Sequence, residues 1–241
     1  MRRTWLWWST GKDSAWALHV LESSTEFEIT ALVTTVTPRF GRVAIHGTRM
    51  AILEAQAAAA GLPLRTIELP YPCTNQQYEA AVVPTLAAAR RAGVEAMAFG
   101  DLFLEDVREY RERLLEGSGV RPTFPIWARD TAELAREMID GGVDARITCL
   151  DPQRVPRDLA GRRLDHDLLD RLPADVDPCG EGGEFHTCVL EGPMLKQAIP
   201  AVSGEVVERE GFVYADLVPG EAAAERPGRL DASRDGAWGR G

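Results

Sequence analysis

Lysine is almost missing from this sequence. Only two of the 27 basic residues are lysines, Lys12 and Lys196, and all the others are arginines. Such a bias is typical of a GC-rich genome. A lysine inside a small polar loop, as at position 12, is therefore unusual against the background of this chain.

Cysteine is also scarce. The four cysteines, at positions 73, 149, 179 and 188, include no Cys-x-x-Cys pair and no spacing typical of a zinc site. No apolar stretch of the signal-peptide kind follows the two arginines near the N-terminus. We therefore expect a cytoplasmic protein with reduced thiols. No apolar run approaches the roughly 20 residues that a membrane-spanning helix needs, so we do not expect a membrane protein.

Positive charge is in deficit as well. The 37 acidic residues outnumber the 27 basic ones and give a formal net charge of −10, which argues against a broad nucleic-acid-binding surface. Apolar residues, by contrast, make up 45% of the 241 residues. This content is sufficient for the core of one large domain or of two modest ones.

Strand-like and helix-like segments alternate along the first half of the chain. Short apolar runs are each followed by a stretch of helical composition, and glycine or proline marks several helix ends. Repeated βα units with short connections predict an α/β fold with a doubly wound, Rossmann-like parallel sheet. The expected strands cover residues 5–8, 28–36, 64–69 and 95–100, and the expected helices cover residues 13–21, 48–60, 76–91 and 104–115.

A second region with a different pattern begins near Gly119. We predict a first domain over residues 1–120 and a smaller C-terminal α+β domain over residues 121–218. Residues 219–241 lack apolar periodicity, so we expect a disordered tail there. The expected elements of the second region are helices at residues 131–140 and 165–172 and strands at residues 143–150, 186–190 and 212–217.

The loop after the first expected strand is the first candidate for chemistry. It reads Ser9-Thr10-Gly11-Lys12-Asp13-Ser14 and leads into an apolar helix. The N–H groups of such a loop and the N-terminus of the helix favour binding of a phosphate. The two serines can add hydroxyl donors, and the lysine can add a positive charge. The same residues also fit a serine-rich helix cap with an acidic first turn. The nucleotide P-loop is excluded, because Leu6 and Asp13 stand where it needs glycine and Ser or Thr.

This loop resembles the Ser-Gly-Gly-x-Asp-Ser loop of the ATP pyrophosphatases, called the PP-loop. The resemblance implies that the loop binds the β- and γ-phosphates of ATP, which these enzymes cleave to AMP and pyrophosphate. Thr10 departs from the pattern, since the family usually has its first glycine there. Because a β-branched residue disfavours positive φ, the loop is strained if the backbone at Thr10 must be left-handed.

A second glycine-rich segment lies late in the chain. Residues 177–187 read Asp-Pro-Cys-Gly-Glu-Gly-Gly-Glu-Phe-His-Thr, a composition that suits a loop close to a ligand. Together with the loop at residues 9–14 and with Phe99-Gly100-Asp101-Leu102, this segment resembles the diphthine-ammonia ligase family of PP-loop proteins. That family has a Glu-(Asn or Gly)-Gly-Glu-(Tyr or Phe)-His-Thr segment late in the chain. The resemblance runs from about residue 5 to residue 217; taken alone, the segment also fits an acidic hairpin turn.

The resemblance implies a ligase that adenylates a carboxylate with ATP and then transfers ammonia to it. Lys12 and Asp13 are implied at the reaction centre. Glu181 and Glu184 are implied to face the same cleft, where they hold Mg²⁺, bind an ammonium ion or deprotonate it. His186 is implied as a base or as a group that orients the substrate. Cys179 lies between these motifs, and we expect it to be a small packing residue and not a nucleophile.

The nucleotide site implied by the resemblance draws on three parts of the chain. His46 is implied to lie near the nucleotide, with an exposed loop histidine as the alternative. Asp101 is a candidate for binding Mg²⁺ or the ribose, and the alternative is that it belongs to an ordinary turn. Asp13 is the second candidate metal ligand. Arg108 or Arg111 is a further candidate for a phosphate, although most charges of that helix are expected on a solvated face. The expected ATP-binding residues are Ser9, Thr10, Gly11, Lys12, Asp13, Ser14, His46, Gly100 and Asp101.

The expected partners follow from the implied reaction: ATP, Mg²⁺, ammonia and a carboxylate on a small molecule or a protein. Diphthine itself belongs to eukaryotic and archaeal elongation factor 2, whereas the arginine-rich composition indicates a bacterial member with a different carboxylate. Free ammonia is the simpler nitrogen donor, because no second catalytic motif for a glutaminase is present. A tRNA-thiolating PP-loop enzyme and a nucleotide-binding sensor without turnover are the alternatives, and assembly as a homo-oligomer stays open.

Overall fold

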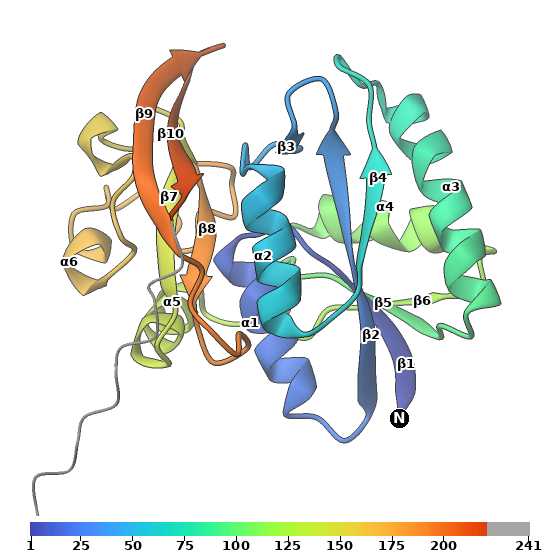
Figure 1. The fold of residues 1–241 in the computed structure, drawn as a ribbon. Coiled ribbons are helices and arrows are strands. Elements are labelled where there is room, and N and C mark those ends of the chain that lie inside the picture. Colours follow the sequence, from blue (N-terminus) through green and yellow to red (C-terminus); the bar gives the residue numbers. More distant parts are fainter. Residues whose placement is uncertain (221–241) are drawn as a thin grey trace, which may run out of the picture.

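A mostly parallel six-stranded sheet forms the centre of the first half of the protein (Figure 1). The computed structural model describes residues 1–220, so nearly all of the tail expected from residue 219 lies outside the described residues. Neighbouring strands follow the order β3-β2-β1-β5-β6, and β4 also pairs with β2. All pairs are parallel except β2 with β3. The strands are β1 (Arg2–Trp7), β2 (Phe27–Thr37), β3 (Arg42–Val43), β4 (Leu64–Glu68), β5 (Ala96–Ala98) and β6 (Arg121–Thr123).

Helices cover both faces of this sheet, which confirms the doubly wound α/β fold (Figure 1). Side chains alternate between the two faces along a strand. Leu6 and Trp8 accordingly pack in the cluster that contains α1 and α2, whereas Trp5 and Trp7 pack in the cluster that contains α3. The helices are α1 (Lys12–Glu22), α2 (Met50–Ala60), α3 (Asn75–Arg91) and α4 (Glu105–Leu115).

The second half builds a separate antiparallel sheet in the order β8-β7-β10-β9. The strands are β7 (Asp144–Leu150), β8 (Phe185–Glu191), β9 (Ala201–Arg209) and β10 (Phe212–Pro219), and the helical segments are α5 (Thr131–Asp140), the 3₁₀ turn η1 (Arg157–Leu159) and α6 (His166–Leu169). Pro219 thus belongs to a strand and not to the expected tail. A small α+β unit after the first sheet agrees with the expectation from the sequence.

Several elements differ from the expectation, and the two-residue strand β3 and the 3₁₀ turn η1 are among those that were not expected. The edge strand β9 was missed because none of its residues is buried, so it carries no apolar alternation. The three-residue strand β6 was also missed, and it pairs with β5, so the first sheet extends to Thr123 and not to residue 120. Helix α6 is shorter than the expected 165–172, since Pro173 disfavours a helical backbone at the residue before it.

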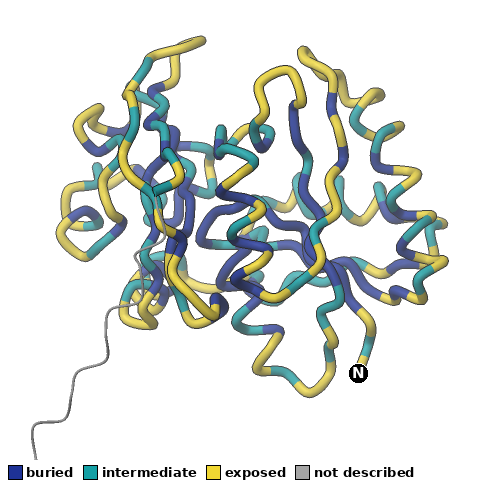
Figure 2. The backbone as a smooth tube through the Cα atoms, viewed as in Figure 1, coloured by how far each residue is buried: buried dark blue, intermediate teal, exposed yellow. Residues whose placement is uncertain are grey.

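The two units share one hydrophobic core. A single cluster of buried side chains joins Leu18 of α1 and Leu53 of α2 to Val189 of β8 and Leu217 of β10. Figure 2 shows buried backbone running through both sheets, while the exposed segments lie at the periphery. The second unit is therefore fixed against the α1 and α2 face of the first.

The order of the strands brings two loops together. The chain passes from β1 to β2 on one side and later to β5 and β6 on the other, so the winding reverses between β1 and β5. In doubly wound sheets, ligands bind at this switch point, beyond the carboxyl ends of the strands. Residues 8–11 and 99–104 follow β1 and β5 and lie at that point. Within residues 1–220, no helix combines the length and the apolar character needed to cross a bilayer.

Candidate active site

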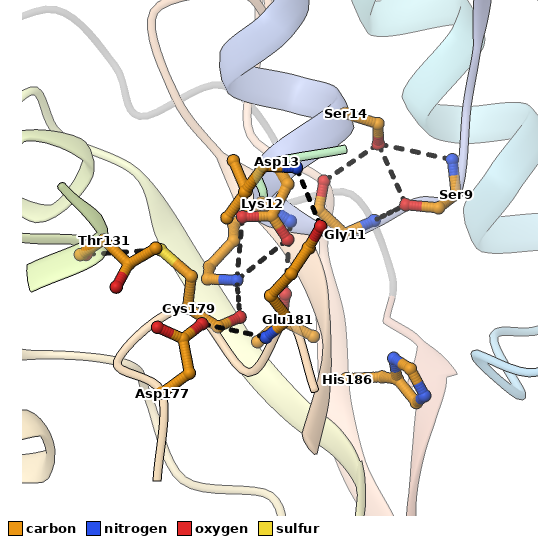
Figure 3. Close-up of polar contacts among 12 residues, drawn as sticks. Ser9, Gly11, Lys12, Asp13, Ser14, Thr131, Asp177, Cys179, Glu181 and His186 are labelled. Carbon is orange, nitrogen blue, oxygen red and sulfur yellow. Dashed lines mark hydrogen bonds and ion pairs between the residues drawn. The ribbon is translucent and has the colours of Figure 1, made fainter. Parts of the chain in front are cut away.

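The loop after β1 ends in a helix start that no side chain caps. Gly11 is the N-cap of α1, and its backbone is extended, with φ −86°. The Ser9 hydroxyl accepts a hydrogen bond from the Gly11 N–H (3.2 Å), and the Ser14 hydroxyl donates to the Gly11 carbonyl (3.0 Å). The two hydroxyls lie 3.1 Å apart and hold the loop in a closed turn (Figure 3). The helix-cap alternative is therefore wrong. The N–H group of Lys12 is bonded to the Thr187 hydroxyl, which leaves the N–H groups of Asp13 and Ser14 in the first turn of α1 for an anion.

Lys12 is buried beside Asp13. Its side chain is 2% exposed, and Nζ lies 2.9 Å from both carboxylate oxygens of Asp13 (Figure 3). Nζ also donates to the Cys179 carbonyl and lies 5.6 Å from the centre of the Phe185 ring. Burial lowers the pKa of Lys12, but Asp13 together with Cys179 and Glu181 raises it, so the net pKa is above its usual value. Lys12 is thus a fixed cation between the loop and the late glycine-rich segment.

The late segment lies directly against this loop. The Lys12 N–H donates to the Thr187 hydroxyl (3.1 Å), and the Val189 N–H donates to the Thr10 carbonyl (2.9 Å). These bonds join the start of α1 to β8, 175 residues further along the chain. The two motifs that are far apart in the sequence therefore form one site.

Glu181 faces the site from this segment. Its Oε1 accepts a hydrogen bond from the Leu102 N–H (2.7 Å), just beyond Asp101, and its own N–H donates to Asp177 (2.9 Å, Figure 3). Burial raises the pKa of Glu181 to about 7, and the nearby Asp13 and Asp101 charges act in the same direction. A carboxyl group with a pKa near neutrality is suited to accept or release a proton.

Glu184 is placed differently from what its motif implies. It is buried but does not line the cleft that holds Glu181. Its Oε1 lies 2.9 Å from Nη2 of Arg154 and accepts a hydrogen bond from the Asp177 N–H (3.3 Å). A Cβ atom at Gly182 would lie only 2.9 Å from Oε1 of Glu184, so a larger residue there would require the Glu184 carboxylate to shift. Glu184 therefore fixes the loop that presents Glu181, and the expectation that Glu184 faces the cleft is wrong.

Two histidines form another wall of the cleft. The rings of His46 and His186 lie 4.7 Å apart between centroids, and His46 Nδ1 is 3.4 Å from the Thr187 carbonyl. Burial lowers the pKa of His46 to about 3, and the neighbouring His186 adds to this shift. Burial also lowers the pKa of His186 to about 4, with a contribution from Lys12. Both imidazoles are therefore neutral at pH 7, and His46 is not the exposed loop histidine of the alternative.

Gly100 and Asp101 close the site from the end of β5. A Cβ atom at Gly100 would lie 2.8 Å from the Ser14 nitrogen and 2.9 Å from the Asp13 carbonyl carbon, so β5 can approach the first turn of α1 only with glycine there. Asp101 lies 3.3 Å from Nε of Arg111, whose guanidinium also lies 5.0 Å from the centre of the Phe99 ring. Arg108 points elsewhere, onto Phe124 and Trp127. Arg111 is thus the arginine of α4 that reaches the cleft.

We expect Gly100→Ala to destabilise the protein by about 1–3 kcal/mol, because the added methyl group must displace the backbone of Asp13 and Ser14. Urea unfolding measures this change. Gly220→Ala is the matched control, since a Cβ atom there meets the nearest Pro200 atom only at 3.5 Å. Equal stability of the Gly100 and Gly220 variants would contradict the close approach of β5 to α1.

These side chains enclose a cleft of about 190 Å³. Thr10 and Gly11 contribute backbone to the loop but do not line the cleft. Asp13 and Asp101 both reach it, although each carboxylate is already paired with a cation. Among residues 1–220, no group of three or more His, Cys, Asp or Glu residues is arranged to hold a metal ion by itself. The lining residues are Trp7, Ser9, Lys12, Asp13, Ser14, His46, Phe99, Gly100, Asp101, Arg111, Cys179, Gly180, Glu181, Phe185, His186 and Thr187.

Cys179 reaches the cleft as a poor nucleophile. Burial raises the pKa of its thiol to about 12, although Lys12 opposes the shift. The Sγ atom lies 3.4 Å from the Thr131 carbonyl, to which the thiol donates. A thiol of this kind is almost fully protonated at neutral pH, which agrees with a packing role.

Two family models match the chain. The model described as the diphthamide synthase N-terminal domain matches residues 1–122, and the model described as the diphthamide synthase C-terminal domain matches residues 130–217. The chain belongs to the diphthamide synthase family. In this member of the diphthamide synthase family, the N-terminal match contributes Lys12, His46 and Asp101 to the cleft. The C-terminal match contributes Glu181 and His186, so neither half contains the complete site.

The relatives of this diphthamide synthase family member are diphthine–ammonia ligases. The chain is 25% identical to the human protein over 184 residues, which cover 72% of this chain and 67% of that protein. It is 28% identical to the Schizosaccharomyces pombe protein over 120 residues, which cover 48% of this chain and 20% of that protein. The match to the Bos taurus protein is 29% over 135 residues, with 52% and 48% covered. The chain therefore spans between about a fifth and two thirds of these relatives.

Proposed function

We propose that this protein is an ATP-dependent ligase that activates a carboxylate as an acyl-adenylate and transfers ammonia to it. The observation that carries the proposal is the joint cleft, in which the uncapped start of α1 and the buried Lys12 face Glu181. One side of the cleft suits phosphates and the other offers a carboxyl group for proton transfer. The names of the relatives, which join diphthine and ammonia, support the same reaction type.

In the first step, an oxygen of the substrate carboxylate attacks the α-phosphorus of ATP, and the bond from this phosphorus to the β-bridging oxygen breaks. Pyrophosphate leaves with the electron pair of that bond. We expect the N–H groups in the first turn of α1 and the ammonium group of Lys12 to stabilise the negative charge that builds on the leaving group. Asp13 and the Cys179 carbonyl hold the Lys12 ammonium in position before ATP binds.

Asp13 and Asp101 fit a magnesium ion that is shared with the nucleotide. Mg²⁺ in such sites usually has one or two protein carboxylates, and phosphate oxygens and waters complete its coordination. Asp13 and Asp101 both line the cleft, and among residues 1–220 no group of three or more His, Cys, Asp or Glu residues is arranged to hold an ion without the nucleotide. When bound, the ion would neutralise charge on the phosphates.

In the second step, the ammonia nitrogen attacks the acyl carbon and AMP leaves. The nitrogen must lose a proton as the amide forms, and Glu181 is placed to accept it from the second half of the cleft. The neutral His46 and His186 can donate or accept hydrogen bonds to the substrate without adding charge. The substrate carboxylate is diphthine or another acid.

The two alternative functions have less support in the site. Sulfur transfer to tRNA is not supported by a reactive thiol, because Cys179, the cysteine that lines the cleft, is protonated at neutral pH. A sensor without turnover would be favoured if Thr10 impaired the loop. The Thr10 hydroxyl and carbonyl are, however, hydrogen-bonded to Thr48, Gln56 and Val189, which hold the loop in shape. The ligase is therefore the function that we propose.

The test is product analysis with Mg-ATP, ammonium and a pool of carboxylic acids labelled with ¹⁸O in the carboxyl group. We expect AMP and pyrophosphate to form, the AMP to carry one ¹⁸O atom, and an amide to appear only when ammonium is present. A Lys12→Ala, Asp13→Ala double variant is the control and should form neither. Formation of ADP and phosphate, or of AMP without the label, contradicts the adenylation step.

A further inference from the structure

Thr10 has a left-handed backbone inside the phosphate-binding loop. Its φ is +75°, a region that glycine adopts readily and β-branched residues rarely adopt. Such a conformation persists only where the surrounding structure holds it. The contacts of Thr10 therefore identify what keeps the loop in shape.

The side chain of Thr10 is held by Thr48. Thr10 is fully buried and Thr48 is 3% exposed. Their Oγ1 atoms lie 2.8 Å apart, so the hydroxyl of Thr10 is bonded on the side away from the cleft. Thr48 lies two residues before α2, which makes the approach to this helix part of the loop's support.

The carbonyl of Thr10 is held by Gln56, in the middle of α2. The Gln56 amide is fully buried and donates to the carbonyls of Thr10 (3.1 Å) and Val189 (2.6 Å). Its oxygen accepts a hydrogen bond from the Trp8 indole N–H (2.8 Å). The Val189 N–H is a second donor to the Thr10 carbonyl (2.9 Å). The peptide that follows Thr10 thus has no freedom to rotate, and β1, α2 and β8 meet at this single amide group.

We propose that Thr48 and Gln56 are positioning residues for ATP, because they hold Thr10 in the left-handed conformation that the phosphate-binding loop requires. This inference rests on the proposed function of the loop. A glycine at position 10 would adopt this backbone conformation without support. Thr10 instead needs the hydrogen bond to Thr48 to stay in it. In a Thr10→Gly variant, the conformation of the loop should therefore no longer depend on the Thr48 hydroxyl.

A double-mutant cycle tests the proposal with wild type, Thr48→Val, Thr10→Gly and the combined variant. The dissociation constant for Mg-ATP is measured by titration calorimetry. We expect Thr48→Val to weaken ATP binding about tenfold in the wild-type background, since a buried hydroxyl of Thr10 loses its partner. In the Thr10→Gly background the same change should alter binding less than about twofold, because glycine adopts this φ without support.

Thr48→Ser keeps the hydroxyl and should bind ATP as wild type does, which separates the hydrogen bond from the general packing of α2. Equal effects of Thr48→Val in the two backgrounds, or none in either, would overturn the proposal. Urea unfolding of the same four proteins without ATP gives a second cycle: coupled effects support the Thr10–Thr48 contact, and additive effects overturn it. Failure of the wild-type protein itself to bind ATP is failure of the proposed function, and the unfolding cycle still tests the contact in that case.

Discussion

Lys12→Met is expected to lower the rate of AMP formation by about 10²- to 10³-fold, the loss typical when one preorganised group that stabilises transition-state charge is removed. Methionine approximates the length of the lysine stem but has no charge. The change also leaves Asp13 without its partner at 2.9 Å. Stability should fall by less than the roughly 3–5 kcal/mol typical of a fully buried pair, because the Asp13 side chain is still 25% exposed.

Two variants separate the catalytic effect of Lys12 from its effect on the fold. Lys196→Met is the matched control, because Lys196 is the other lysine of the chain and is exposed; its AMP formation should stay within about twofold of wild type. In Lys12→Met, Asp13→Asn, no unpaired carboxylate remains, so most of the stability should return. AMP formation should stay low, because this variant lacks both Lys12 and the Asp13 carboxylate that we propose for Mg²⁺. Recovery of the rate together with stability would show that Lys12 serves only the fold.

Glu181→Gln is expected to lower amide formation by about 10²- to 10⁴-fold, which is the usual contribution of a positioned general base. In wild type the carboxylate is the active form, so the rate at a fixed concentration of free ammonia should rise with pH through about 7, the raised pKa of Glu181. The variant should lack this rise. The rate is measured as amide formed from the acid identified in the product screen. Hydroxylamine, which is neutral near pH 7, should restore much of the lost turnover because it depends less on a base.

The stability of Glu181→Gln should change in the opposite direction from its activity. Burial raises the pKa of Glu181 from 4.5 to about 7, so the folded state binds this proton more tightly than the unfolded state. The contribution of Glu181 to the free energy of unfolding of wild type is therefore highest below pH 4.5, where Glu181 is protonated in both states. This contribution decreases as the pH rises to about 7. Above pH 7, where wild type must keep a charged carboxylate buried, Glu181→Gln should be more stable by up to about 3 kcal/mol. A less active variant that is also less stable at pH 8 would indicate misfolding and not loss of a base.

Local pattern in the sequence was sufficient for the strands β1, β2, β4 and β5 of the first sheet and for the main motif. Trp5 to Trp8 are all buried and alternate between two cores, as a strand covered on both faces requires. The loop at residues 9–14 lies where a strand is followed by a helix, so its position at the carboxyl edge of the sheet follows from the fold class. Both expectations depend on residues that are neighbours in the chain.

Contacts between distant residues decided what the sequence could not. Glu181 and Glu184 are three residues apart in a glycine-rich segment. Their different positions follow from their partners: Glu181 accepts a hydrogen bond from the Leu102 N–H at the cleft, whereas Glu184 pairs with Arg154 away from it. Arg111 and Arg108 are both charged positions on the same helix, but only the Arg111 guanidinium lies over Phe99 and beside Asp101 in the cleft. No signal within either pair distinguishes its two members.

The shared core has a consequence for how such proteins can evolve. Two separate family models describe the halves of the chain, which suggests parts that recombination could exchange. Yet Thr10 and Lys12 bond to Val189 and Thr187 across the junction, and one apolar cluster runs from α1 to β10. A chimaera that joins the first half of one relative to the second half of another would break these contacts unless both parents carry matching residues at the junction. The halves are thus expected to be inherited together and to accumulate changes in pairs across the junction.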